Sequence, residues 1–173
     1  MNQPIPRGAP LVLLDMDNCI SDDGWRIGRI RNGHRDPMVK YHDYHMLAPF
    51  DAVGNQHLFD MSRYPSGSAL VIITARPNHY RAFTEHWLAR HSVAARRVLM
   101  RADTDFRPSP EVKRAALRSL LHEEERSVDS VMAAYDDHIE NLLMYRREGV
   151  RHAMLYKLHD ICAYTTPLKE QAL

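Results

Sequence analysis

The chain has 173 residues, of which 45% are hydrophobic, and its 23 basic and 22 acidic residues give a formal net charge of +1 at pH 7. This length is enough for one domain with a substantial core and too short for two ordinary ones. The near-neutral charge gives no general electrostatic argument for binding to nucleic acid or to a membrane surface.

The first predicted strand covers residues 10–15 and is followed by acidic side chains. Its apolar residues run without interruption into Asp15, and Asp17 comes two positions later. Such a run indicates a fully buried strand of a parallel sheet, with carboxylates at its carboxyl end. An ordinary acidic turn after a strand would give the same pattern, so these residues alone leave both interpretations open.

Residues 18–68 form the least regular part of the chain, polar and rich in His, Tyr and Arg. The pattern predicts no sustained element there beyond a short helix near residues 46–61. We interpret the segment as an insertion over the top of the sheet, a small cap. Loops of this length inside a compact domain often carry function.

Strands and helices alternate over the remaining residues. Apolar runs predict strands at 69–73, 97–100, 130–135 and 152–156, and helices are expected at 78–91, 109–121 and 139–148. Asn78 and Ser109 are predicted N-caps, and Gly149 is a predicted C-cap. This alternation predicts an α/β fold, a Rossmann-like three-layer sandwich with a mainly parallel central sheet covered on both faces.

Polar side chains follow several of these predicted strands. In a parallel sheet the carboxyl ends of the strands lie on one edge, so such groups can meet although they are far apart in sequence. The groups are Asp15 and Asp17 after the first strand, Thr74 after the second, Lys113 in the helix after the third, and Asp136 and Asp137 after the fourth.

The order of these motifs resembles that of the haloacid dehalogenase (HAD) superfamily of phosphotransferases, over residues 11–156. Within the superfamily the chain is most similar to the phosphatase half of phage-type polynucleotide kinase/3′-phosphatases. Cys19 departs from the pattern, because Thr or Val is commoner there, and its similar size predicts little effect. The closer similarity rests on Leu99-Met100-Arg101, on Asp105-x-Arg107 followed by Lys113, and on Tyr135-Asp136-Asp137 followed by Asn141.

The resemblance implies a phosphatase that works through an aspartyl-phosphate. Asp15 would be the nucleophile, and Asp17 would first protonate the leaving alkoxide and then activate water. Such covalent catalysis divides one difficult step into two easier ones. Thr74 would donate a hydrogen bond to a phosphoryl oxygen, and Lys113 would balance the negative charge of the carboxylates and of the transition state.

The same resemblance implies Mg²⁺ as the cofactor. Asp15, Asp136 and the main-chain carbonyl of Asp17 would hold the metal, and Asp137 would orient its ligands or waters. Oxygen atoms are the ligands that Mg²⁺ prefers.

Substrate recognition is assigned mainly to the insertion. Aromatic and basic residues interleave there, which is typical of nucleotide binding, although packing on the sheet explains any one of them equally well. Arg76, two residues after Thr74, is a predicted phosphate contact because the motif fixes its position. The substrate-contact candidates within the insertion are Trp25, Arg26, Tyr44 and Asn55.

The sequence therefore predicts a Mg²⁺-dependent phosphatase of a nucleotide or polynucleotide end, with a 3′-phosphate favoured. A 5′(3′)-mononucleotide phosphatase is the alternative substrate assignment. No Gly-x-x-x-x-Gly-Lys-Ser/Thr motif occurs, so no kinase half is expected. A phospho-accepting receiver module and an end-binding module without turnover are alternatives of another class. Receivers place their acidic pair after the first strand, whereas the Asp pair here comes late, which favours the phosphatase.

The rest of the sequence indicates the setting of the protein. Two cysteines, Cys19 and Cys162, do not make a disulfide framework or a zinc site. The first residues lack the apolar core of a signal peptide, and no apolar run approaches the ~18 residues of a membrane span. We expect a cytoplasmic protein without membrane contact, in which residues 1–173 form one domain with residues 18–68 as its cap. Its oligomeric state is left open.

Overall fold

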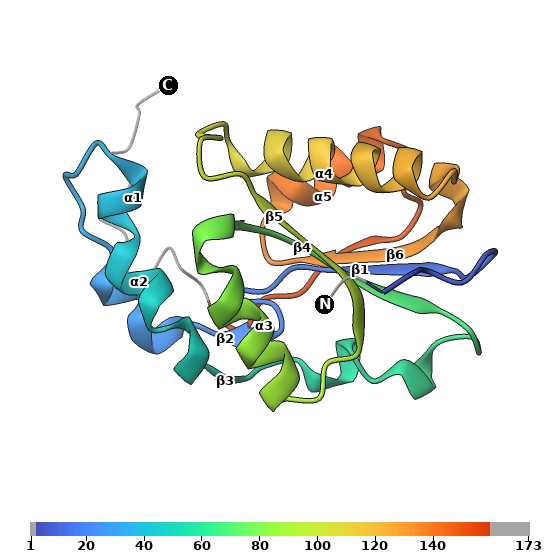
Figure 1. The fold of residues 1–173 in the computed structure, drawn as a ribbon, viewed down its shortest axis with the longest axis horizontal. Coiled ribbons are helices and arrows are strands. Elements are labelled where there is room, and N and C mark those ends of the chain that lie inside the picture. Colours follow the sequence, from blue (N-terminus) through green and yellow to red (C-terminus); the bar gives the residue numbers. More distant parts are fainter. Residues whose placement is uncertain (1–2, 160–173) are drawn as a thin grey trace, which may run out of the picture.

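A five-stranded parallel sheet forms the centre of the computed structural model, which describes residues 3–159. The strand order β5-β4-β1-β6-β7 places β1 in the middle, where it pairs with β4 on one side and β6 on the other (Figure 1). This position explains why all four residues of β1 are buried. The strands are β1 (Leu11–Leu14), β4 (Ala69–Pro77), β5 (Ala95–Arg101), β6 (Val131–Asp136) and β7 (Ala153–Leu155).

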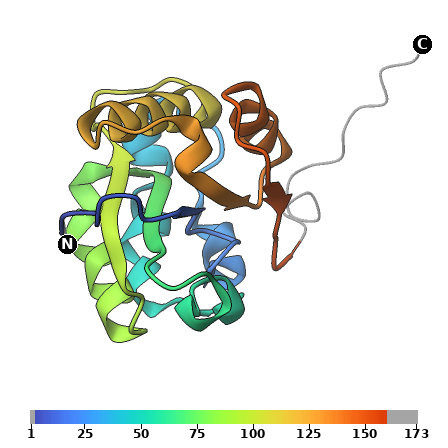
Figure 2. The same ribbon diagram turned by 90° about the vertical axis from the view of Figure 1, so that its right-hand side faces the viewer.

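Helices cover both faces of this sheet, as Figures 1 and 2 show. Leu11 and Leu13 of β1 pack in the same core cluster as residues of α4 (Ser109–Glu123) and α5 (Ile139–Arg147). Val12 and Leu14, which alternate with them, lie in a second cluster with residues of α3 (Arg81–Arg90). Side chains of a strand alternate between its two faces, so β1 supplies both cores. The prediction of a three-layer α/β sandwich is confirmed.

The insertion between β1 and β4 consists of short elements. The predicted helix over residues 46–61 is wrong, because residues 52–54 pair with residues 20–22 instead: β2 and β3 form an antiparallel ribbon, and Gly54 N donates to Ile20 O at 2.8 Å. The elements are β2 (Ser21–Asp22), α1 (Pro37–Lys40), α2 (His42–Met46), β3 (Ala52–Val53) and 3-10 turns at Gly24–Arg29, Ala48–Phe50, Gln56–Leu58 and Met61–Arg63.

The predicted N-caps of two helices are wrong, and the predicted C-cap of a third is confirmed. A 3-10 turn, Asn78–Tyr80, precedes α3, and the Asn78 side chain accepts a hydrogen bond from Arg81 Nε at 2.8 Å instead of capping the backbone. Ser109 is the first residue of α4 and makes no capping bond, because the chain enters the helix from Pro108. Gly149 follows α5 with φ +99°, a conformation that favours glycine.

The described residues bear on two of the expectations, those about membrane spans and about the cysteines. None of the helices within residues 3–159 is long and apolar enough to cross a membrane. Cys19 is a buried free thiol, whereas Cys162 lies outside the described residues.

One further 3-10 turn, Val128–Ser130, leads into β6.

Candidate active site

A cavity of about 430 Å³ lies where the carboxyl ends of the strands face the insertion. Its size falls in the range of ordinary small-molecule sites. The four predicted catalytic residues, Asp15, Asp17, Thr74 and Lys113, all line it. Parallel strand ends meet at one edge of the sheet, which is why residues so distant in sequence converge here.

Lys113 binds two of the carboxylates directly. Its Nζ lies 2.8 Å from Asp15 Oδ1 and 2.6 Å from Asp136 Oδ2, and only 1% of the Lys113 side chain is exposed. Burial lowers the pKa of Lys113, but the charges of Asp136 and Asp15 outweigh burial and raise it well above its ordinary value. Lys113 is therefore a positively charged group between the ends of β1 and β6.

The carboxylate cluster fits a divalent cation. Asp15, Asp136 and Asp137 each offer one oxygen, and these oxygens lie within 4.8 Å of one another. Burial raises the pKa of Asp15 well above its ordinary value, with the Lys113 charge acting against this and the charges of Asp136 and Asp137 adding to it. Burial and the charge of Asp136 likewise raise the pKa of Asp137 to about 6. Lys113 contacts Asp15 and Asp136, and its charge also acts on Asp137. Carboxylate oxygens of this kind are ligands that suit Mg²⁺.

The motif residue Asn141 belongs to the support of this cluster. Its Nδ2 donates to Asp136 Oδ1 at 2.8 Å, and the backbone N–H of His138 donates to the same oxygen at 3.1 Å. Both residues lie at the start of α5. Asp136 is thus held by two helices, α4 through Lys113 and α5 through Asn141.

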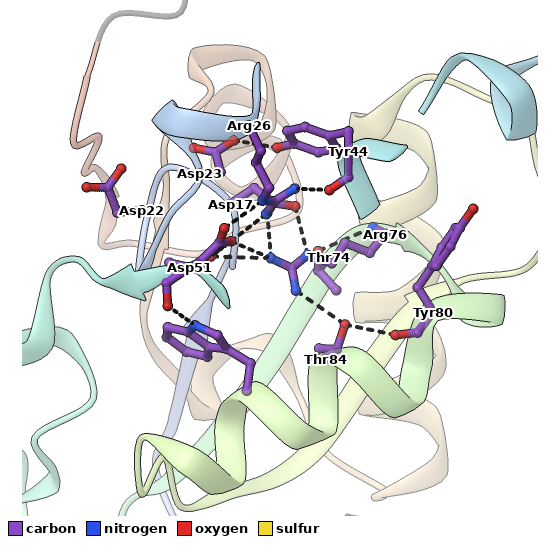
Figure 3. Close-up of polar contacts among 12 residues, drawn as sticks. Asp17, Asp22, Asp23, Arg26, Tyr44, Asp51, Thr74, Arg76, Tyr80 and Thr84 are labelled. Carbon is purple, nitrogen blue, oxygen red and sulfur yellow. Dashed lines mark hydrogen bonds and ion pairs between the residues drawn. The ribbon is translucent and has the colours of Figure 1, made fainter. Parts of the chain in front are cut away.

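The side chain of Asp17 does not bind Lys113 and instead pairs with two arginines, Arg26 and Arg76 (Figure 3). Arg76 donates to it twice, from Nε to Oδ2 at 2.9 Å and from Nη2 to Oδ1 at 2.5 Å, and Arg26 Nη2 donates to the same Oδ1. Burial raises the pKa of Asp17, but the charges of Arg76 and Arg26 outweigh burial and hold this pKa well below its usual range. Asp17 is therefore an ionised carboxylate in this arrangement.

Thr74 is a buried residue that lines the cavity. It is 2% exposed, and its Oγ1 accepts the backbone N–H of Arg76 at 3.3 Å. Because the oxygen accepts this bond, the hydroxyl proton of Thr74 can serve an acceptor in the cavity.

The predicted substrate contacts divide into two groups. Arg76 and Tyr44 line the cavity, and the Tyr44 hydroxyl donates to Asp23. Arg26, Trp25 and Asn55 are not among the described residues that line it. Arg26 is fully buried against Asp17, Trp25 is 52% exposed, and Asn55 Nδ2 donates to the backbone carbonyl of Cys19 at 2.8 Å.

Two features of the site have no counterpart in the sequence prediction. Asp51, a buried residue of the insertion, binds Arg26 with both carboxylate oxygens at 2.7 and 2.6 Å. An apolar wall of the cavity includes Met38, Tyr41 and Phe106. No motif spacing marked these residues, although interleaved aromatics did point to the insertion in general.

His45 is a neutral histidine among aromatic rings. It is 8% exposed, and its ring centroid lies 5.1 Å from that of Tyr44 and 5.0 Å from that of Tyr80. Burial lowers the pKa of His45 from 6.5 to about 3, and the Arg76 charge adds to this while Asp17 acts against it.

His45 should therefore make the protein acid-sensitive. Below pH 6.5 the unfolded chain binds a proton at this residue and the folded chain does not, so stability falls as the pH drops toward 3. Between pH 7 and pH 5 we expect the wild type to lose about 2 kcal/mol more than a His45→Phe variant, which keeps the ring contacts. Urea denaturation at both pH values measures this difference. An equal loss in the two proteins would contradict it.

The sequence matches no protein-family model and no curated protein. Solved structures do match. A chain of the Pnkp1/Rnl/Hen1 RNA repair complex superposes with a TM-score of 0.61 and 24% identity, over 90% of this chain and 45% of that one. The present chain spans about half the length of the Pnkp1/Rnl/Hen1 chains that it matches.

Two hydrolase structures match over nearly their full length. A haloacid dehalogenase-like hydrolase from Streptococcus pneumoniae has a TM-score of 0.63 and 10% identity, with 90% of this chain and 89% of that one covered. A HAD-superfamily hydrolase of subfamily IA from Geobacter sulfurreducens has a TM-score of 0.56 and 12% identity, over 87% and 88% of the two chains. The protein thus has the fold of the haloacid dehalogenase-like hydrolases, as the order of its motifs predicted.

Proposed function

We propose that this protein is a Mg²⁺-dependent phosphatase that hydrolyses a phosphate monoester at a nucleotide or polynucleotide end, with a 3′-phosphate favoured. One observation carries the proposal: Asp15, Asp17, Thr74 and Lys113 line one cavity, beside the carboxylates Asp136 and Asp137. A phosphate dianion resists an anionic nucleophile, so hydrolysis needs positive charge and fixed geometry around it. The cavity supplies both.

Asp15 is the proposed nucleophile. Its carboxylate oxygen forms a bond to phosphorus while the bond from phosphorus to the leaving oxygen breaks, and Asp17 gives that oxygen a proton. In the second step Asp17 takes a proton from water, which attacks the phosphorus and releases Asp15. Bound Mg²⁺ would neutralise charge on the phosphoryl oxygens and orient them.

The arginine pairing of Asp17 bears on both steps. An ionised Asp17 is ready to accept the proton of water in the second step. For the first step it must carry a proton, and a nearby phosphate dianion raises the pKa of a carboxyl by like-charge repulsion. Substrate binding therefore moves the pKa of Asp17 upward, toward the protonation that the first step needs.

The residues around the phosphate have supporting roles. Lys113 fixes Asp15 through its bond at 2.8 Å and balances the charge that develops in the transition state. Thr74 donates a hydrogen bond from its hydroxyl to a phosphoryl oxygen. Asp15, Asp136 and the main-chain carbonyl of Asp17 would hold Mg²⁺, with Asp137 beside them.

A nucleoside is the leaving group that the cavity wall favours. Pro37, Met38 and Tyr41 from the insertion and Phe106 from the loop before α4 line the cavity, and Phe106 is 62% exposed. A phosphate group alone needs no apolar wall, whereas exposed aromatic rings are the surfaces on which nucleobases stack. The similarity to a chain of an RNA repair complex is consistent with a polynucleotide end. We further propose one domain over residues 1–173, with residues 18–68 as the cap that supplies the Pro37, Met38 and Tyr41 part of this wall.

A substrate panel tests the proposal. The protein is incubated with 3′- and 5′-phosphorylated oligonucleotides, with 3′- and 5′-mononucleotides and with β-glycerophosphate, each with Mg²⁺ or with EDTA. Fastest Mg²⁺-dependent phosphate release from the 3′-phosphorylated oligonucleotide is the expected result, and preference for mononucleotides would support the alternative nucleotidase. A single stable phosphorylation without turnover would indicate a receiver-like module. No phosphate release from any compound would overturn the proposal.

Phe106→Ala should weaken nucleotide binding selectively. Stacking on an aromatic side chain contributes about 1–3 kcal/mol per base, so KM for the 3′-phosphorylated oligonucleotide should rise by about fivefold to a hundredfold. KM for β-glycerophosphate, which has no base, should stay the same. Phe50→Ala is the matched control, because Phe50 is 67% exposed and is not among the cavity-lining residues described. An equal rise for both substrates would contradict a base-stacking role.

A further inference from the structure

Asp51 is a fully buried carboxylate that no catalytic role assigned above explains. It lies in the insertion, between the 3-10 turn Ala48–Phe50 and β3, and none of its side chain is exposed. Both oxygens accept hydrogen bonds at short distances (Figure 3). The donors are Arg26 Nε at 2.7 Å and Trp25 Nε1 at 3.0 Å to Oδ1, and Arg26 Nη2 at 2.6 Å and Ser21 Oγ at 2.5 Å to Oδ2.

The two arginines next to Asp51 also bind Asp17. Arg26 Nη2 bridges the two carboxylates, because it donates to Asp17 Oδ1 as well as to Asp51 Oδ2. Arg76 Nη2 also lies between them, 2.5 Å from Asp17 Oδ1 and 3.6 Å from Asp51 Oδ2. Two guanidinium groups, at most 1% exposed, are therefore enclosed between two carboxylates.

This arrangement joins the insertion to the sheet. Arg26 and Asp51 come from the insertion, whereas Asp17 follows β1 and Arg76 belongs to β4. The backbone carbonyl of Asp51 is fixed in turn, since Trp87 Nε1 of α3 donates to it at 2.9 Å. Asp51 is thus held from the core of the molecule and holds Arg26 in its place.

Charge balance gives Asp51 a particular importance. Two guanidinium cations repel each other, and Asp17 alone would leave them with one unit of negative charge. Asp51 supplies the second unit, and its two oxygens match the fork of Nε and Nη2 on Arg26, a geometry that fixes the guanidinium plane. Without that carboxylate, Arg26 loses the two bonds that fix its Nε and Nη2 edge and keeps, besides Asp17, the bond from Nη1 to the backbone carbonyl of Tyr44 at 2.9 Å.

We propose that Asp51 is a positioning residue of this active site: its carboxylate holds Arg26 and Arg76 in the orientation in which they bind Asp17, so that the insertion completes the catalytic centre. This inference rests on the proposed phosphatase function. It gives the insertion a role in the chemical step, in addition to the substrate recognition assigned to it above. A purely structural ion pair inside the insertion is the competing explanation.

The kinetic test uses Asp51→Asn, which keeps the size of the side chain and one carbonyl oxygen but removes the charge. We expect kcat for the 3′-phosphorylated oligonucleotide to fall about tenfold to a hundredfold, with KM changed less than about threefold, because Asp51 does not touch substrate. The matched control is Asp43→Asn, which breaks the exposed ion pair between Asp43 and Arg31 of the same insertion at 2.7 Å and should leave kcat unchanged. An unchanged kcat in a folded Asp51→Asn protein would overturn the proposal.

A second readout does not depend on activity. Buried and hydrogen-bonded arginine Nε–H groups give separate signals in ¹H–¹⁵N NMR spectra. Arg26 Nε donates to Asp51, whereas Arg76 Nε donates to Asp17 at 2.9 Å. We expect Asp51→Asn to shift or broaden both signals. A change confined to Arg26 would indicate the purely structural ion pair and overturn the proposal. If the wild type releases no phosphate at all, the proposed function fails, and this spectrum still tests the role of Asp51.

Ser21→Ala keeps the test decisive if Asp51→Asn does not fold. Ser21 Oγ donates to Asp51 at 2.5 Å and accepts from Arg76 Nη2 at 3.3 Å, so its removal loosens the same carboxylate without creating an unpaired buried charge. The expected result is an about threefold to tenfold lower kcat with an unchanged KM and a shifted Arg76 Nε–H signal. Wild-type kcat together with an unshifted signal would overturn the proposal.

Discussion

Replacing Asp15 with asparagine is expected to lower kcat by at least about 10³-fold, which corresponds to about 4 kcal/mol of transition-state stabilisation. An amide oxygen cannot form the covalent phosphate ester that the proposed mechanism requires of this carboxylate. The asparagine side chain would still offer an oxygen to Lys113, whose Nζ lies 2.8 Å from Asp15 Oδ1 in the wild type. Phosphate release from the 3′-phosphorylated oligonucleotide, with Mg²⁺ present, measures the loss.

The loss of activity should not come from unfolding. Burial raises the pKa of Asp15 well above its ordinary value, which means that the folded protein disfavours the charge at this position. Removing the charge should therefore leave the free energy of unfolding the same or higher, as urea denaturation can show. Asp129→Asn, at an exposed ion pair with Arg151, is the control that should retain full activity. Wild-type turnover in Asp15→Asn would contradict the assignment of the nucleophile.

The sheet and the sheet-edge residues of the site were predictable because their signals are local. An uninterrupted apolar run shows a central parallel strand, and the carboxyl ends of such strands lie on one edge. Asp15, Thr74 and Lys113 could therefore be placed in one cavity from their positions alone. The N-caps failed because Asn78 and Ser109 have suitable side chains but the chain enters both helices by other geometries.

The insertion could not be predicted in detail because distant contacts fix it. Residues 52–54 pair with residues 20–22 in place of the expected helix, and nothing in a local window marks that pairing. Arg26 stood out as a basic residue among aromatics, a pattern that favours a substrate contact, yet both of its carboxylate partners are within the protein. Asp51 had no signal at all, since a single acid in an irregular segment is most often a turn residue.

Lys113→Met should damage both stability and activity. Lys113 is the only cation that the described structure places in direct contact with Asp15 and Asp136, at 2.8 and 2.6 Å. Removing one partner of a buried ion pair costs about 3–5 kcal/mol, because the remaining charges stay buried without compensation. We expect a loss of that size in the free energy of unfolding, measured with urea in EDTA at pH 7, and a kcat lower by about 10²-fold or more. Lys40→Met, on the insertion, is the control for the loss of a lysine.

The pH and Mg²⁺ dependence of this variant tests the cause of the loss. Without Lys113 the pKa of Asp15 should rise further above its unfolded value, so the destabilisation should be larger at pH 7 and should shrink as the pH falls and the carboxyl takes up a proton. Mg²⁺ should also restore part of the lost stability at pH 7, because a divalent cation binds the folded cluster and compensates the same carboxylates. A deficit that is equal at pH 7 and pH 5.5 and is unaffected by Mg²⁺ would show that Lys113 acts through packing. In that case the charge balance among Asp15, Asp136 and Asp137 would not be what holds this edge of the sheet together.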